Sequence, residues 1–227
     1  MKIAENYTGR ENSLPLGKVH HGDCQRILAH MEEGSADLIV IDPPYLVNYR
    51  DRQGRSIAND VDESWLQPSF KEMYRVLADD SFCISFYGYH VVDKFMAAWK
   101  AAGFRPVGQF IWHKSYASST GFTQFRHEAA YLLAKGKPHK PKAPLPSVMP
   151  WAYSGNKRHP TEKSVAILKP LIETYSKRGD RVLDPFCGSG STLVAAMQTG
   201  RSAVGIELNR KFALGAQRRV NSVMEGY

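Results

Sequence analysis

Short apolar runs rich in β-branched and aromatic residues alternate with segments of helical periodicity along most of the chain, and this alternation constrains the fold more than any other sequence feature. The runs that predict buried strands are 37–41, 82–86, 109–112, 130–133, 181–184 and 202–206. Apolar residues spaced three to four apart predict helices over 69–76, 91–102, 164–175, 191–198 and 210–220. Strands that alternate with helices indicate an α/β fold with a mostly parallel sheet.

The size and composition of the chain fit one such domain. Its 227 residues, 43% hydrophobic and 23% charged, can bury a core, which excludes a globally disordered protein. No apolar run approaches the roughly 18 residues of a membrane span, and the N-terminus lacks the apolar segment of an export signal. Cys24, Cys83 and Cys187 form neither a disulfide set nor a metal-ligand pair. We therefore expect a single cytoplasmic domain over 1–227.

Two stretches interrupt the alternation and predict long loops. The first, 46–63, is polar and directly follows a predicted strand. The second, 135–161, holds six of the thirteen prolines, six Lys or Arg residues, and no Asp or Glu. A proline-rich basic segment of this length favours a functional loop, and the alternative is a solvated surface excursion or linker. The total charge of +8 permits a polyanionic partner without requiring one.

The tetrapeptide Asp42-Pro43-Pro44-Tyr45 ends the predicted strand 37–41. Ligands of open α/β sheets bind at the carboxyl ends of strands, so this tetrapeptide lies where chemistry is expected. The prolines stiffen the loop and donate no backbone hydrogen bonds. Asp42 and the carbonyl of Pro43 could accept both N–H groups of a planar amine, while the Tyr45 ring stacks on its plane. Alternatively, the tetrapeptide is an Asp-capped turn with a core tyrosine.

A glycine turn, Asp184-Pro185-Phe186-Cys187-Gly188-Ser189-Gly190, joins the predicted strand 181–184 to the helix 191–198. Glycines let a ligand approach the backbone, and the N-terminus of a helix is electropositive. The next strand ends at Glu207, where a carboxylate fits hydrogen bonding to two ribose hydroxyls. These features predict a nucleotide-type cofactor site that is neither a P-loop nor a standard dinucleotide fingerprint. The alternative is an ordinary tight turn with a solvated Glu207.

Together, the two motifs resemble those of the beta subgroup of amino DNA methyltransferases, in which the Asp-Pro-Pro-Tyr tetrapeptide precedes the Phe-x-Gly-x-Gly cofactor motif. His21-Gly22-Asp23-Cys24 and the segment 159–164 also resemble signatures of that family. The resemblance covers roughly residues 17–219. It implies a Rossmann-like methyltransferase fold with helices on both faces of the sheet and a circularly permuted motif order.

The resemblance also implies S-adenosyl-L-methionine as cofactor and assigns residues to its site. The implied cofactor-binding residues are Asp23, Cys24, Asp42, His159, Thr161, Glu162, Lys163, Ser164, Asp184, Pro185, Phe186, Gly188, Ser189, Gly190, Glu207 and Leu208. The implied catalytic residues are Asp42, Pro43, Pro44 and Tyr45. With no room for a separate recognition domain, target recognition is expected from insertions at 46–63 and 114–158.

Basic residues of these insertions are the predicted DNA contacts. They are Arg50, Arg52, Arg55, Lys114, Lys135, Lys137, Lys140, Lys142, Lys157 and Arg158. Lysines and arginines of this kind would anchor phosphates without reading sequence. For the three arginines of the first insertion, a solvated loop is an equally weighted alternative.

The implied reaction is methyl transfer to the exocyclic N6 amine of adenine in double-stranded DNA, with the target base flipped out of the helix. The tetrapeptide begins with Asp, which in this family leans toward adenine. The alternatives are an N4-cytosine or RNA amino-methyltransferase and a catalytically silent nucleic-acid-binding regulator. Carbon-5 methylation is disfavoured because no Pro-Cys nucleophile occurs. We expect no metal site, and homodimerisation and a restriction partner stay open.

Overall fold

The structure is a computed structural model that describes residues 16–47, 60, 62–155 and 162–226. In chain order its elements are β1 (Gly17–His21), α1 (Cys24–Leu28), β2 (Ala36–Ile41), α2 (Leu66–Val76), β3 (Leu77–Phe86), the 3₁₀ turn η1 (Tyr89–Val91), α3 (Val92–Ala102), β4 (Arg105–His113), β5 (Ser119–Thr120), β6 (Gln124–Phe125), β7 (His127–Ala134), β8 (Val148–Pro150), α4 (Val165–Tyr175), β9 (Arg181–Asp184), α5 (Ser191–Gln198), β10 (Ser202–Glu207) and α6 (Arg210–Met224). Every predicted strand and helix is present, several of them longer than predicted. The α/β prediction is confirmed.

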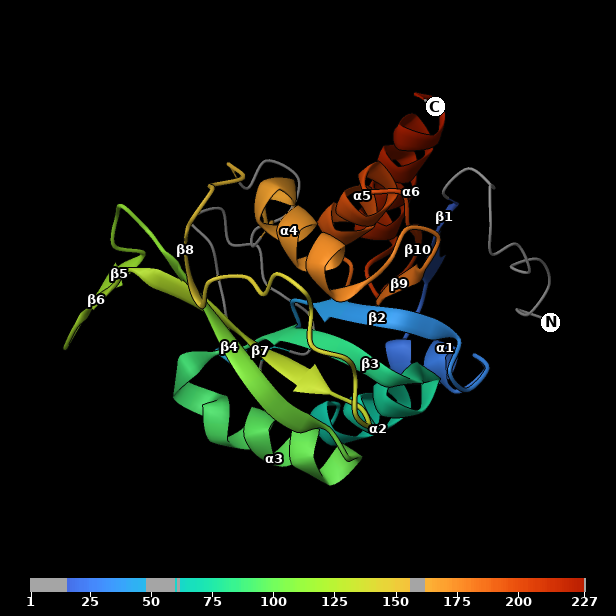
Figure 1. Ribbon diagram of the computed structural model, residues 1–227. Coiled ribbons are helices and arrows are strands. Elements are labelled where there is room, and N and C mark those ends of the chain that lie inside the picture. Colours follow the sequence, from blue (N-terminus) through green and yellow to red (C-terminus); the bar gives the residue numbers. More distant parts are fainter. Residues whose placement is uncertain (1–15, 48–59, 61, 156–161, 227) are drawn as a thin grey trace.

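Eight strands form one sheet in the order β1-β10-β9-β2-β3-β7-β4-β8. All neighbours are parallel except β7, which runs antiparallel to both β3 and β4. Helices cover both faces of this sheet, with α4, α5 and α6 on one side and α1, α2 and α3 on the other (Figure 1). The arrangement is the mostly parallel, helix-covered sheet that the resemblance implied.

Alternate residues of β2 enter the two halves of the core. Leu38 and Val40 pack into the cluster beneath α4 and α5, whereas Ile39 and Ile41 pack into the cluster beneath α2 and α3. All four side chains are fully buried. A strand that is buried on both faces has a continuous apolar sequence, which explains why 37–41 could be predicted as a strand.

Six short elements were not predicted, namely β1, α1, η1, β5, β6 and β8. β1 is a polar five-residue strand at the sheet edge, and α1 has five residues. β8 lies within the proline-rich segment and pairs in parallel with β4, Ile111 opposite Val148. The segment between β7 and β8 therefore leaves the sheet at the amino ends of the parallel strands and returns toward their carboxyl ends. It is part of the fold rather than a detached excursion.

Helix ends follow the expected chemistry. Gly103 ends α3 in the left-handed conformation, with φ of 105°, and Asn209 caps the start of α6 by accepting from Lys211 N and Phe212 N. Among the described residues, no helix is both long and apolar enough to cross a membrane.

Candidate active site at the carboxyl edge of the sheet

The two chemistry-bearing motifs come from neighbouring strands. β2 pairs with β9 in parallel, with Leu38 opposite Val182 and Ile39 opposite Leu183. Both strands therefore end at the same edge of the sheet, where Asp42 follows β2 and Asp184 ends β9. Parallel pairing of strands that are far apart in the sequence thus unites the tetrapeptide with the glycine turn at one edge.

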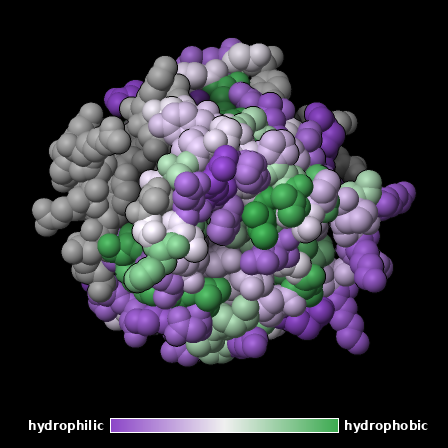
Figure 2. All heavy atoms as spheres, turned by 90° about the vertical axis from the view of Figure 1, so that its left-hand side faces the viewer, coloured by the Kyte–Doolittle hydropathy of each residue, from purple (hydrophilic) through white to green (hydrophobic). Residues whose placement is uncertain are grey.

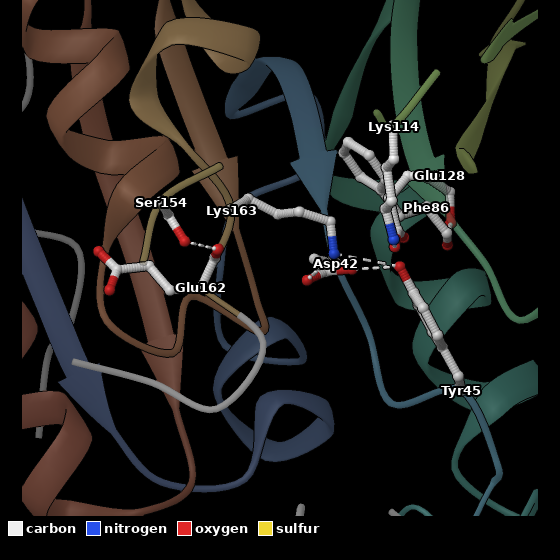
Figure 3. A network of polar contacts seen from close by, with 9 residues as sticks. Asp42, Tyr45, Phe86, Lys114, Glu128, Ser154, Glu162 and Lys163 are labelled. Atoms are coloured by element: carbon white, nitrogen blue, oxygen red, sulfur yellow. Dashed lines mark hydrogen bonds and ion pairs between the residues drawn. The ribbon is translucent and has the colours of Figure 1, made fainter. Parts of the chain in front are cut away.

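Asp42, Tyr45 and Lys163 form one hydrogen-bonded group (Figure 3). The Tyr45 hydroxyl donates to Asp42 Oδ1 at 2.6 Å, and Lys163 Nζ donates to Asp42 Oδ2 at 2.7 Å. Lys163 Nζ also lies 3.3 Å from the Tyr45 hydroxyl oxygen. The motifs predicted Asp42 and Tyr45 in one cavity, and they assigned Lys163 to the cofactor without foreseeing its ion pair with Asp42.

Aromatic rings enclose this group. The Lys163 ammonium lies 4.9 Å from the ring centroid of Phe86 and 5.5 Å from that of Tyr45. Gly88 follows β3 at the point where Tyr45 crosses it, and a Cβ at Gly88 would lie 2.8 Å from the Tyr45 carbonyl oxygen. The missing side chain at position 88 therefore allows the close approach that brings Tyr45 beside Asp42.

Burial and charge act in opposite directions on the Asp42 carboxyl. Burial raises its pKa above the ordinary value, while the ion pair with Lys163 and the hydrogen bond from Tyr45 oppose that rise. Burial, together with the Asp42 charge, raises the pKa of Tyr45, which therefore stays a neutral donor. Asp42 is the acceptor and Tyr45 and Lys163 are the donors of this group.

A second buried ion pair lies beside it. Lys114, which follows β4, pairs with Glu128 of β7 and donates to Ser118 Oγ at 2.7 Å. Figure 3 shows this pair beside Phe86, on the same side of Asp42 as Tyr45. The Glu128 charge contributes to the raised pKa values of Asp42 and Tyr45. Sequence reasoning had not assigned Glu128 to the site.

The glycine turn is held in shape by Glu207. Its Oε2 accepts from Gly188 N at 3.0 Å and its Oε1 accepts from Asn209 N at 2.7 Å. Gly188 and Gly190 both have positive φ, 49° and 80°, which only glycine adopts readily. Glu207 thus lies beside the glycine turn and is partly exposed.

The Asp184 side chain accepts a hydrogen bond within the first half of the glycine turn. Its Oδ1 accepts from Phe186 N at 3.0 Å, and the carboxyl is almost fully buried. Burial raises the pKa of Asp184 to about 7. Pro185 and Ser189 are buried in the same turn, and the Phe186 ring packs edge-on against Trp65 at 5.2 Å.

Arg219 of α6 joins the turn to the segment before α4. Its Nη1 donates to the Ser189 carbonyl oxygen at 2.9 Å and lies 3.4 Å from Glu162 Oε1. Ser154 Oγ in turn donates to the Glu162 carbonyl oxygen at 2.5 Å. Sequence reasoning missed Arg219, because a single arginine in an amphipathic helix carries no motif.

A partly open pocket connects the two motifs. Its walls include Asp42 and Lys163 on one side and Asp184, Gly188 and Ser189 on the other. Glu162, Phe86 and Phe186 also line it.

The remaining predicted cofactor residues lie around this edge. Asp23 caps α1 by accepting from Gln25 N at 2.8 Å, next to β1, which pairs with the Glu207 end of β10. Cys24 Sγ lies 3.6 Å from Ser69 Oγ, and burial raises its pKa to about 11. Ser164 caps α4, and Leu208 is exposed beside Glu207. His159 and Thr161 lie outside the described residues.

The structure corrects the predicted DNA contacts of Lys114 and Lys135. Lys114 is buried and paired with Glu128, as above. Lys135 is buried and donates to the Leu77 carbonyl oxygen at 2.7 Å, with Asp79 at 3.1 Å. The charges of both lysines are compensated inside the protein, so neither ammonium is presented to a phosphate.

Of the remaining predicted DNA contacts, the structure describes only Lys137, Lys140 and Lys142. β7 runs antiparallel to β3, so Lys137, which follows it, lies at the edge of the sheet opposite to Asp42. Lys140 is exposed and Lys142 follows it on the segment that leads back to β8. Arg50, Arg52, Arg55, Lys157 and Arg158 lie outside the described residues.

Cys83 and Cys187 are buried, and burial raises the pKa of each thiol, so neither is an activated nucleophile. In the described part of the chain, no group of three or more His, Cys, Asp or Glu residues could hold a metal ion.

Comparison with known proteins identifies the family. The DNA methylase model of the N6/N4 type matches residues 36–218. The chain belongs to the N6/N4 DNA methylase family. Among curated relatives, the Escherichia coli (strain K12) protein named "Putative methylase YubD" is 53% identical over 208 residues, which are 92% of each chain. The type II methyltransferase M2.MboI of Moraxella bovis is 25% identical over 243 residues, covering 90% of this chain and 88% of that one.

A solved structure shares the methylase fold. TTHA0409 of Thermus thermophilus, named "Putative DNA Modification Methylase" and complexed with S-adenosyl-L-methionine, superposes with a TM-score of 0.74 at 23% identity, covering 93% of this chain and 96% of that one. The methylase family and the Rossmann-like methyltransferase fold that the motifs implied are therefore confirmed.

Proposed function

We propose that this N6/N4 DNA methylase transfers a methyl group from S-adenosyl-L-methionine to the exocyclic N6 amine of adenine in DNA. The observation that carries the proposal is the shared pocket, in which the Asp42 carboxylate and the glycine turn at Gly188 line the same space. One wall offers acceptors for an amine, and the other has the backbone geometry of a nucleotide-type site.

The second wall fits the cofactor. Glu207 stands at the strand end where ribose hydroxyls are bound in related folds, and the glycine turn leaves room for close backbone approach. Asp184, Gly188 and Glu162 are proposed to hold the cofactor in this pocket, and Asp23, which caps α1, is proposed to contact it as well. S-adenosyl-L-methionine would supply there a methyl group activated by a cationic sulfur.

The first wall is proposed to prepare the amine. An adenine amine is a weak nucleophile because its lone pair is delocalised into the ring. Hydrogen bonds from that amine to Asp42 and to the carbonyl of Pro43 would favour the tetrahedral nitrogen of the transition state. Pro44 keeps this stretch extended, and the Tyr45 ring would stack on the base.

Lys163 is proposed to keep Asp42 ready for this role. A buried carboxyl tends to take up a proton, and a protonated Asp42 would offer a weaker acceptor. The ammonium at 2.7 Å opposes that tendency. Lys163 therefore acts on Asp42 as a positioning residue in addition to lining the cofactor pocket.

The substrate is proposed to be double-stranded DNA with the target base flipped out. A base inside a duplex cannot reach a carboxylate that lies in a pocket, and Tyr45 would replace part of the stacking that flipping removes. Adenine is proposed over cytosine because the tetrapeptide begins with Asp rather than Ser. The same two acceptors would also serve the N4 amine of cytosine, which is the second candidate substrate.

Nucleoside analysis tests the proposal. The purified protein is incubated with labelled S-adenosyl-L-methionine and unmethylated plasmid DNA, and the digested DNA is separated into nucleosides. Labelled N6-methyladenine is the expected product. Labelled N4-methylcytosine would instead support the second candidate substrate, and absence of label from DNA, with label in RNA or nowhere, would overturn the DNA assignment.

A further inference from the structure

A small hairpin projects from the carboxyl edge of the sheet and carries a fully exposed phenylalanine at its tip. β5 and β6 form a two-stranded sheet of their own, with Ser119 opposite Phe125. Figure 1 shows this hairpin extending away from the body of the molecule. Phe122 lies in the turn between the strands and is completely exposed. A large aromatic side chain in that position loses hydrophobic stabilisation unless a partner covers it.

The root of the hairpin is firmly held. Ser118 N donates to the Phe125 carbonyl oxygen at 2.8 Å, and Lys114 N donates to the Arg126 carbonyl oxygen at 2.8 Å. The buried Lys114 ammonium, besides pairing with Glu128, lies 5.6 Å from the ring centroid of Phe125. The hairpin is thus anchored to β4 and β7 by a charge that is fixed inside the protein.

Aromatic stacking braces the same root from the turn after β3. Tyr89, in that turn, stacks on Phe125 with 4.8 Å between ring centroids and 28° between planes. Tyr89 is itself largely exposed. In Figure 2, the side from which the hairpin projects faces the viewer, and exposed hydrophobic side chains lie there among hydrophilic ones.

The hairpin stands at the same edge of the sheet as the acceptor group. His113 of β4 pairs with His127 of β7, and Phe86 of β3 pairs with Ala130 of β7. The loop that joins β4 to β7 therefore lies beyond the carboxyl end of β3, where Gly88 supports Tyr45. Glu128, next to His127 in β7, lies beside Phe86 and the buried Lys114 (Figure 3).

The charge of the hairpin suits a polyanion. Residues 115–126 contain no Asp or Glu, and their one charged residue is the exposed Arg126. The other side chains of this stretch, aromatic rings apart, are small or uncharged polar groups. A partner that presents both phosphates and flat apolar rings matches this combination, and duplex DNA is such a partner.

We propose that the β5–β6 hairpin is a DNA wedge, with Phe122 inserting into the base stack beside the nucleotide that is flipped toward Asp42. The inference rests on the proposed function, because its partner is the DNA substrate. Flipping a base out of a duplex removes stacking from its neighbours, and an inserted aromatic ring replaces part of that stacking. Phe122 would then stabilise the opened duplex, while Asp42 and Tyr45 receive the flipped base.

Kinetics on two duplexes test the wedge. Both carry the site located by sequencing the methylated DNA; one is fully paired, and the other has a mismatch opposite the target base, which makes flipping easier. Phe122→Ala is expected to lower kcat/KM roughly ten- to a hundredfold on the paired duplex, and by less than about threefold on the mismatched one. Phe122→Trp should keep most of the activity, because its ring can also stack.

Leu214→Ala is the matched control, since Leu214 is an exposed apolar residue on α6. It should behave as wild type on both duplexes. Equal losses for Phe122→Ala on the two duplexes, or no loss on either, would overturn the wedge. Sedimentation of the proteins without DNA tests whether Phe122 instead contacts a second copy of the chain. A dimer that Phe122→Ala dissociates would also overturn the wedge.

A fluorescence measurement separates failure of the wedge from failure of the proposed function. DNA should quench the indole emission of the Phe122→Trp variant more than it quenches the wild type, whose own tryptophans supply the baseline. A protein that methylates no DNA but shows this extra quenching keeps the contact of Phe122 with DNA and loses the proposed function. A protein that methylates DNA without extra quenching loses the wedge alone.

Discussion

Lys163 and Asp42 are joined by a 2.7 Å hydrogen bond that spans 121 positions of the sequence. The pair connects the segment before α4 to the end of β2, so the residue that the family motif assigns to the cofactor also contacts the proposed acceptor. This contact makes the protonation state of Asp42 depend on a residue outside the tetrapeptide.

Removing the charge of Lys163 should shift the pH dependence of methyl transfer. Burial raises the Asp42 pKa and Lys163 lowers it, so in Lys163→Met the pKa rises further, while Tyr45, Glu128 and Asp184 still face the carboxyl. Because the carboxylate is the active form, the acid limb of the rate profile moves to higher pH. Lys163→Arg should keep the wild-type limb.

The measurement is kcat against pH for the three proteins. A Lys163→Met protein with the wild-type profile and only a raised KM for S-adenosyl-L-methionine would contradict the assigned effect on Asp42. That result would leave Lys163 with a role in cofactor binding alone.

Gly88→Ala should impair catalysis by displacing Tyr45. The added Cβ would lie 2.8 Å from the Tyr45 carbonyl oxygen and 3.0 Å from its Cβ, so the backbone must shift. We expect kcat to fall roughly tenfold or more, with cofactor affinity unchanged, because the glycine turn is untouched. Gly215→Ala is the control, since nothing lies within 4 Å of its added Cβ. Equal kcat values in the two variants would refute this role of Gly88.

Removing one partner of the buried Lys114–Glu128 pair should destabilise the protein, because the remaining charge would be buried without its partner. Lys114→Met leaves the Glu128 carboxylate without its partner at a largely buried site, and we expect a loss of about 3–5 kcal/mol in the free energy of unfolding. The double variant Lys114→Met/Glu128→Leu should lose less than Lys114→Met alone. Urea denaturation measures both variants and the single variant Glu128→Leu, and a double variant that loses the sum of the two single losses would show that the charges are not coupled.

Asp184 should make the protein less stable as pH rises. Its pKa is about 7 in the folded protein against an ordinary value of 3.8, so between these pH values the unfolded chain has released a proton that the folded state keeps. The free energy of unfolding therefore decreases through this window. Asp184→Asn cannot titrate, so its stability relative to wild type should improve from about pH 4 to about pH 7. A constant difference across that range would be inconsistent with the raised pKa.

The architecture and both motifs could be predicted from the sequence because they depend on local signals. β2 contains the apolar run 38–41, and the tetrapeptide and glycine turn each occupy a few adjacent residues. Their meeting in one pocket followed from the rule that ligands bind at the carboxyl ends of parallel strands.

The contacts that sequence reasoning missed are all long-range. The Lys163–Asp42 pair and the contact of Arg219 with Ser189 join residues that no local pattern relates. The predicted basic surface failed at Lys135 for a related reason. Composition shows the number of lysines, whereas the antiparallel direction of β7 decides that Lys135 and Lys137 leave the sheet at the edge opposite to Asp42.

The most direct test of the account pairs two measurements on Asp42→Ala. Methyl incorporation into DNA is followed with labelled S-adenosyl-L-methionine, and cofactor affinity is measured by titration calorimetry. We predict that methyl transfer falls by at least about a hundredfold while the affinity for the cofactor stays largely intact, because the glycine turn and Glu207 are unchanged. Full turnover by Asp42→Ala would contradict the central claim that Asp42 prepares the target amine.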